Sequence, residues 1–136
     1  MERTLILVKP DAFARNLTGE IIARFERKGL RLVALNLMTM TREHAAEHYA
    51  EHEGKAFYDE LVGFITSGPL VAMVLEGKQA VSAARQVIGA TNPLEASSGS
   101  IRGDYAIEVG KNMVHGSDSQ ESGTREAAIF FPGLAG

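Results

Sequence analysis

The chain has 136 residues, of which 45% are hydrophobic and 23% charged, with a formal net charge of −3 and no cysteine. This length and balance are typical of one soluble globular domain over residues 1–136, and the acidic balance argues against a broad nucleic-acid footprint. The absence of cysteine excludes disulfides, thiol catalysis and thiolate metal sites. The first apolar run is too short for a signal peptide and no run could span a membrane. We therefore expect a cytoplasmic protein with no membrane partner and no stable nucleic-acid partner.

The first part of the chain alternates short apolar runs with an amphipathic segment. Residues 5–8 predict a buried strand, which Pro10 ends. Residues 18–28 predict a helix with one apolar face, and Gly29 supplies its stop. A second apolar strand is expected over residues 30–38.

The middle of the chain predicts a helical insert followed by another strand and helix. One helix is expected over residues 41–52 and a second over residues 57–65. Residues 70–75 form a third apolar run, and residues 78–88 predict a helix with alanine and branched side chains turned inward.

The last part of the chain contains a long loop over residues 90–112, rich in glycine, serine and proline. A loop of this length inside one domain is more often functional than idle. A short strand is expected over residues 113–115. Asp118 and Glu121 are spaced like a capping box for a helix that runs to about Ala128.

The order of elements is strand, helix, strand, helical insert, strand, helix, loop, strand, helix. Without the insert, this is the split βαβ pattern of a ferredoxin-like α+β sandwich, with a four-stranded antiparallel sheet and helices. Several strands are continuous apolar runs. We therefore expect one face of the sheet to pack on helices and the other on a second layer, such as a subunit partner.

The run Asn-Met-Val-His-Gly-Ser-Asp-Ser at residues 112–119 carries the strongest chemical signal. His115 follows a strand and precedes a helix, whose N-terminal end favours an anion such as phosphate. A neutral imidazole can attack phosphorus, and a chain with four histidines and no cysteine offers few other nucleophiles. Glu126, in the following helix, could fix the tautomer and orientation of that ring.

Three further histidines, His44, His48 and His52, are spaced by four and therefore lie near one face of a helix. A row of metal ligands is one interpretation. We favour a solvated charged face, because glutamates are interleaved with the histidines and the glutamate placement of a zinc protease is lacking.

Lys9, Arg85 and Arg102 lie at element ends or beside the long loop, where phosphate-binding groups are usually placed. If these three side chains met in one pocket, they would suit a triphosphate, but their spacing in the sequence does not show whether they meet. The chain has neither G-x-x-x-x-G-K-[ST] nor G-x-G-x-x-G, so a phosphate site must be built from side chains. Phe57 and Tyr49 are core residues on one interpretation. On the other, Phe57 is an exposed platform on which any base could stack.

Seven segments in order resemble the nucleoside diphosphate kinases, over essentially the whole chain. They are residues 4–11, 19–22, 48–52, 64–69, 89–93, 101–104 and 112–119. The resemblance implies a ping-pong phosphotransferase that uses ATP and other nucleoside triphosphates and diphosphates. His115 would take the γ-phosphoryl group and pass it to a different nucleoside diphosphate. Broad base and sugar tolerance would let the enzyme maintain the ribo- and deoxyribonucleoside triphosphate pools.

The same resemblance implies roles for other residues. Glu126 would orient His115, Ser117 would lie beside it, Tyr49 would support the phosphohistidine, and Lys9 would act on phosphate and sugar. The positions that match nucleotide contacts are Lys9, Phe57, Arg85, Thr91, Arg102, Val109 and Asn112. Mg²⁺ would be carried by the nucleotide phosphates, with no direct protein ligand, and the protein would form a homohexamer or, alternatively, a homotetramer.

Two other functions stay open at this point. A ferredoxin-like module could hold a nucleotide without doing chemistry, since fold does not fix function. A single-strand nucleic-acid binder is suggested only by the aromatic residues and a few arginines. Neither the reactive ring nitrogen of His115 nor the size of the oligomer follows from the sequence.

Overall fold

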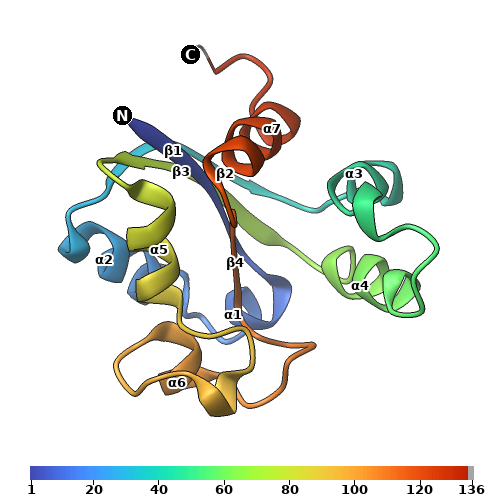
Figure 1. Ribbon diagram of the computed structural model, residues 1–136. Coiled ribbons are helices and arrows are strands. Elements are labelled where there is room, and N and C mark those ends of the chain that lie inside the picture. The colour runs from blue at the N-terminus through green and yellow to red at the C-terminus, as the bar shows by residue number, and fades with distance from the viewer. Residues whose placement is uncertain (135–136) are drawn as a thin grey trace.

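A four-stranded antiparallel sheet runs through the middle of the protein, as the computed structural model shows over residues 1–134 (Figure 1). The strands are β1 (Glu2–Val8), β2 (Arg31–Met38), β3 (Leu70–Gly77) and β4 (Val114–Gly116). Their order in the sheet is β2-β3-β1-β4, so the two central strands are β1 and β3. This sheet and its helices confirm the predicted α+β sandwich.

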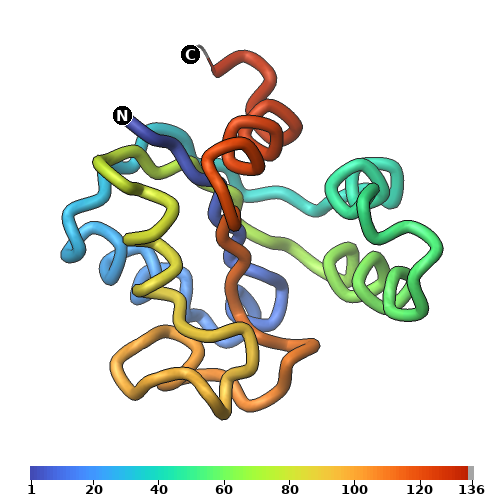
Figure 2. The backbone as a smooth tube through the Cα atoms, in the orientation of Figure 1, coloured from blue at the N-terminus to red at the C-terminus, as the bar shows by residue number. Residues whose placement is uncertain are grey.

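Helices cover both faces of the two central strands, as the path of the chain shows (Figure 2). The helices are α1 (Pro10–Ala14), α2 (Thr18–Lys28), α3 (Arg42–His48), α4 (Tyr58–Ile65), α5 (Ala80–Ile88), α6 (Ile101–Tyr105) and α7 (Gln120–Phe130), with 3₁₀ turns η1 (Ala50–His52) and η2 (Pro93–Glu95). Side chains alternate along a strand, so Ile6 and Val8 pack with α2 and α5, whereas Leu5 and Leu7 pack with α3, α4 and α7. The expected second layer is therefore formed by the chain's own helices.

The end of α2 is set by Gly29, as predicted. Gly29 has a φ of 102°, in the left-handed region where a side chain is strained. The next amide, that of Leu30, donates a hydrogen bond of 3.2 Å to the carbonyl of Phe25. This closes the last turn and aims the chain into β2.

Three local predictions were wrong or incomplete. Proline at the first position of a helix is pre-shaped for it, so Pro10 both ends β1 and begins α1, which the sequence analysis missed. The predicted helix over residues 41–52 ends at His48 and continues as a 3₁₀ turn. The loop over residues 90–112 contains the helical segments η2 and α6, which the sequence analysis did not predict.

The predicted capping box at the start of α7 is also wrong. Ser119, rather than Asp118, is the N-cap, because its hydroxyl accepts a hydrogen bond of 3.0 Å from the amide of Ser122. The Asp118 carboxylate instead accepts from the Ser122 hydroxyl, which together with nearby Arg85 lowers the pKa of Asp118 against the opposing effect of burial.

The two edges of the sheet differ in exposure. On the edge strand β2, Leu35 and Leu37 are 51% and 59% exposed. At the other edge, Val114 of β4 is fully buried. Within residues 1–134, no helix combines the length and apolarity needed to cross a membrane.

Candidate active site

Pairing between β1 and β4 brings the two ends of the sequence together at one edge of the sheet. Leu7 pairs with His115, and the amide of Lys9 donates a hydrogen bond of 2.9 Å to the carbonyl of Met113. The Lys9 ammonium donates a second bond, of 2.9 Å, to the side-chain oxygen of Asn112. A lysine that follows the first strand therefore lies beside the loop that precedes His115.

The backbone just before His115 is tightly bent. Met113 has a φ of 76°, and the amide of Val114 donates to the carbonyl of Asn112 at 2.8 Å, which is the hydrogen bond of a γ-turn. The Met113 amide is held by the carboxylate of Asp11 at 3.2 Å. A strained, tied turn of this kind fixes where the residues on either side of it point.

Gly116 lets the helix α5 approach the end of β4 closely. A Cβ atom at Gly116 would lie 2.5 Å from Cδ1 of Ile88, so a side chain there would force the buried Ile88 to shift. The carbonyl of Gly116 accepts a hydrogen bond of 3.2 Å from the guanidinium of Arg85. The glycine after His115 therefore lets the end of β4 lie close to α5.

His115 is held by a buried carboxylate. Its Nε2 lies 2.8 Å from Oε1 of Glu126, and the Ser117 hydroxyl donates to the same oxygen at 2.8 Å. Burial opposes ionisation of Glu126, but the hydrogen bonds from His115 and Ser117 outweigh it and lower the pKa of this carboxyl. An ionised carboxylate only accepts hydrogen bonds, so Nε2 carries the proton and Nδ1 has the free lone pair.

The three predicted cations converge on the same place. Arg102 is 7% exposed and donates to the carbonyls of Asn112, Gly89 and Val114 at 3.2, 3.2 and 2.7 Å. Burial, and then the charge of Arg85, lower the pKa of Arg102 to about 10. Burial, and then the charge of Arg102, lower the pKa of Lys9 to about 8, while Asp11 opposes the shift. Both groups therefore remain charged at neutral pH.

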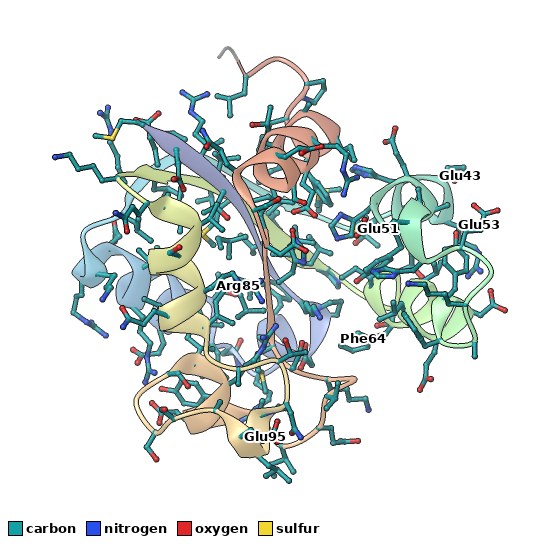
Figure 3. All side chains as sticks on the ribbon, viewed as in Figure 1. Glu43, Glu51, Glu53, Phe64, Arg85 and Glu95 are labelled. Atoms are coloured by element: carbon teal, nitrogen blue, oxygen red, sulfur yellow. The ribbon has the colours of Figure 1, made fainter. Side chains whose placement is uncertain are left out.

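One pocket collects most of these side chains. It is lined by Lys9, His48, Tyr49, Glu51, His52, Arg85, Thr91, Arg102, Asn112, His115, Gly116, Asp118 and Glu126. Figure 3 labels Arg85 and Glu51, which reach this region from α5 and from the α3–α4 insert on opposite sides of β4. A nucleophilic nitrogen among three cations is suited to a phosphate chain.

Three predicted site residues lie outside the lining of this pocket. Phe57 and Val109 do not line the pocket but are exposed, at 45% and 53% of their surface, so a base could stack on them. Ser117 is fully buried behind Glu126. Thr91 lines the pocket, and its carbonyl accepts from the side chain of Asn112 at 3.3 Å.

Tyr49 lines the pocket but is only 9% exposed. Burial, and then the negative charge of Glu126, raise the pKa of the Tyr49 hydroxyl to about 12. This hydroxyl therefore stays protonated and can donate a hydrogen bond into the pocket.

The interpretation of the three spaced histidines as a solvated face was wrong. His48 is 3% exposed and lines the pocket, as does His52. The interleaved glutamates are exposed, and Glu43 points outward in Figure 3, although Glu51 also lines the pocket. Ala45 and Tyr49, which are both buried, mark the inner side of this segment, and their apolar spacing was the signal that could have placed His48 inside. Among residues 1–134, no group of three or more acidic or histidine side chains could hold a metal ion.

Comparison with known proteins agrees with this geometry. The sequence model of the family described as nucleoside diphosphate kinase matches residues 2–135. The chain is 62% identical to the nucleoside diphosphate kinase of Frankia casuarinae over 135 residues, which are 99% of this chain and 98% of that relative. It is 60% identical to that of Carboxydothermus hydrogenoformans over 131 residues, covering 96% and 88% of the two chains.

Solved structures show the same similarity. The fold superimposes on the crystal structure of nucleoside diphosphate kinase from Encephalitozoon cuniculi with a TM-score of 0.94 and 46% identity, covering 96% of this chain and 89% of that one. For the enzyme of Halobacterium salinarum, solved in complex with CDP, the TM-score is 0.93 and the identity 51%, covering 96% and 87%.

Proposed function

We propose that His115 carries the phosphoryl group in this protein, because the chain belongs to the nucleoside diphosphate kinase family. The protein is thus a phosphotransferase that moves the γ-phosphoryl group of a nucleoside triphosphate to a nucleoside diphosphate and so maintains the triphosphate pools. The observation that supports His115 is its 2.8 Å hydrogen bond to Glu126 at the edge of a cationic pocket.

The chemistry starts from Nδ1 of His115, since Nε2 gives its proton to the hydrogen bond with Glu126. The Nδ1 lone pair attacks the γ-phosphorus and forms an N–P bond. The bond from that phosphorus to the bridging oxygen breaks, and its electron pair leaves on the β-phosphate of the diphosphate. The charge of Glu126 stabilises the positive charge that develops on the ring. A second diphosphate then reverses these steps.

The cations supply positioning and charge for this transfer. Lys9, Arg85 and Arg102 hold the phosphates, and a fixed positive charge lowers the barrier because it acts on charge that develops in the transition state. Asn112 and Thr91 hold phosphate and sugar oxygens, and the protonated Tyr49 hydroxyl donates toward the phosphohistidine. Ser117 acts indirectly, because its hydrogen bond keeps Glu126 ionised and in place.

Recognition of the base is loose in this proposal. Phe57 and Val109 are exposed and apolar, so they would hold a base between them through its faces. Stacking on the faces reads no hydrogen-bonding edge, which predicts that purines and pyrimidines are both accepted.

As a nucleotide-binding kinase, the protein acts with a divalent metal ion, and we propose that the ion is Mg²⁺ carried by the nucleotide phosphates. The residues present fit such an ion without a direct protein ligand, because the Asp118 carboxylate lines the pocket and would face the water molecules that Mg²⁺ usually keeps. The ion would neutralise part of the phosphate charge.

We further propose that residues 1–136 form a single domain that works in the cytoplasm as a homohexamer, with a homotetramer as the alternative. Exposed leucines on β2 and exposed apolar residues on the loop over 90–112 support association. Light scattering coupled to size-exclusion chromatography would give the subunit number directly.

The experiment that tests the proposed nucleophile is labelling with γ-³²P-ATP. We expect an acid-labile, alkali-stable phosphoprotein that loses its label to added GDP, no label on His115→Ala, and full label on the control His44→Ala. Glu126→Gln should form the phosphoprotein about 10- to 100-fold more slowly, because the ring loses its charged partner. Normal labelling of His115→Ala would rule out His115. Nucleotide binding without any label on the wild type would instead favour a binding module.

A further inference from the structure

His48 is a buried imidazole that the proposed chemistry does not use. It is 3% exposed, and neither of its ring nitrogens has a hydrogen-bond partner. A buried polar atom without a partner is uncommon and calls for an explanation. His48 is also in contact with the nucleophile, since the centroids of the His48 and His115 rings are 4.9 Å apart.

The two rings are nearly perpendicular, at 79°. Two other rings hold the His48 ring: Tyr49 lies 4.7 Å from it and Phe130 lies 5.4 Å from it. Such edge-to-face pairs have a preferred geometry. His48 is therefore a fixed surface rather than a mobile side chain.

Helix α7 connects the two contacts of His115. Glu126 and Phe130 are four residues apart, so they project from the same face of α7. Glu126 bonds Nε2 of His115, and Phe130 supports the His48 ring that packs against His115. The nucleophile is thus held by a hydrogen bond at one atom and by a ring contact.

The hydrogen bond alone does not fix the plane of the His115 ring. Rotation about the bond between Cβ and the ring has broad minima, and a bond at Nε2 tolerates some of that rotation. The same rotation swings Nδ1 away from the line of attack on phosphorus. A perpendicular ring in contact with His115 blocks this movement.

We propose that His48 is a positioning residue whose flat ring sets the plane of His115 and so directs Nδ1 toward the γ-phosphorus. This inference rests on the proposed role of His115. It assigns the effect to the shape of the ring, so a phenyl ring should replace it.

The surroundings keep His48 from taking part as a charged group. Burial, and then His115 when it is protonated and the positive charges of Arg125 and Lys9, lower the pKa of His48 to about 3, against the opposing charge of Glu126. The ring is neutral at physiological pH and does not compete with His115 for a salt bridge with this carboxylate.

The test measures phosphoenzyme formation after rapid mixing with ATP, which separates the maximal rate from the apparent affinity for ATP. The variants are His48→Phe, His48→Leu and His48→Ala, with His44→Ala as the matched control, since His44 lies one turn earlier and stacks on Phe130. Melting temperatures are measured for all of them. Leucine fills space without a flat ring, so it keeps the test valid if His48→Ala fails to fold.

We expect His48→Leu and His48→Ala to lower the maximal rate about ten-fold with the affinity for ATP changed less than two-fold, because the change misdirects the nucleophile alone. His48→Phe should recover at least half of the wild-type rate, and His44→Ala should match the wild type. If His48 served only to stabilise the fold, its substitution would lower the melting temperature but leave the maximal rate of the folded protein unchanged.

Two results would overturn the inference: a wild-type maximal rate in His48→Leu, or a rate in His48→Phe as low as that of His48→Ala. Labelling of His115→Ala, run beside these variants, reports on the proposed function separately. If His115→Ala is unlabelled and His48→Leu is normal, only the role of His48 is wrong.

Discussion

The two walls of the pocket are built by different means. The polar wall contains Lys9, Arg85, Arg102, Asn112, His115 and Glu126, and each of these side chains has a hydrogen bond to another part of the chain. The ring wall contains His48, Tyr49 and His52, with ring centroids 4.7 and 6.2 Å apart along the series, and Phe57, 5.4 Å from the His52 ring, continues it outside the pocket. In the ring wall, by contrast, both ring nitrogens of His48 lack a hydrogen-bond partner, and so does Nδ1 of His52.

The polar wall therefore supplies charge to the pocket, whereas the ring wall supplies a surface of defined shape. In the polar wall, hydrogen bonds tie side chains of α5, α6 and α7 to β4 and to the loop before it, so the charges are held in place. The ring wall belongs to the α3–α4 insert, which lies to one side of the sheet in Figure 1 and presents surfaces instead of charges. We therefore expect substitutions in the polar wall to change turnover most, and those in the ring wall to change orientation and stacking.

The largest expected effect comes from Arg102. Arg102→Ala and Arg85→Ala should each lower turnover about 100-fold, because each removes a charge from the transition state. Only Arg102 holds three backbone carbonyls, so its loss should also destabilise the fold by about 2–4 kcal/mol, against about 1 kcal/mol or less for Arg85. Urea unfolding measures the difference. Equal stability of the two variants would show that the hydrogen bonds of Arg102 do not anchor this wall.

A smaller effect on stability is expected when the pH is lowered, because His48 of the ring wall is involved. The pKa of His48 is about 3 in the folded protein and 6.5 ordinarily, so between these values the unfolded chain binds a proton that the folded protein does not. Stability should therefore fall as the pH drops below 6.5, by at most about 1.4 kcal/mol per pH unit.

His48→Phe should remove this part of the pH dependence. The measurement is urea unfolding between pH 6.5 and about pH 5, above the range in which Glu126, with its lowered pKa, begins to contribute. Parallel curves for the variant and the wild type would mean that His48 takes up a proton in the folded state.

The smallest effect is expected at the outer end of the ring wall. Phe57→Ala should raise the KM for nucleotides roughly five- to ten-fold with kcat nearly unchanged, since it removes stacking far from the phosphates. The rise should be the same for adenine, guanine and thymine nucleotides. Val109→Ala should follow the same pattern more weakly, because less apolar area is lost. A rise confined to one base would indicate recognition of its edge.

Much of the fold follows from local patterns. Apolar runs marked the four strands, and Gly29 marked the end of a helix, because these features depend on a few neighbouring residues. The position of His115 between a strand and a helix could also be predicted, since one short segment contains all the residues that indicate it.

The composition of the site was harder to predict. The convergence of Lys9, Arg85 and Arg102 depends on the pairing of β1 with β4 and on a loop whose path no local pattern describes. His48 was misplaced because the interleaved glutamates favoured an exposed face, whereas the spacing of Ala45 and Tyr49, which pack with Phe130 of α7, marks the buried side.

The order of the strands also has a consequence for assembly. The reactive imidazole lies on β4 at one margin of the sheet, and the two exposed leucines lie on β2 at the far margin, with two strands between them. Subunits joined through β2 would leave each reaction centre open to incoming nucleotide. Every copy would then work independently, and its saturation curve would be hyperbolic whatever the number of copies in the particle.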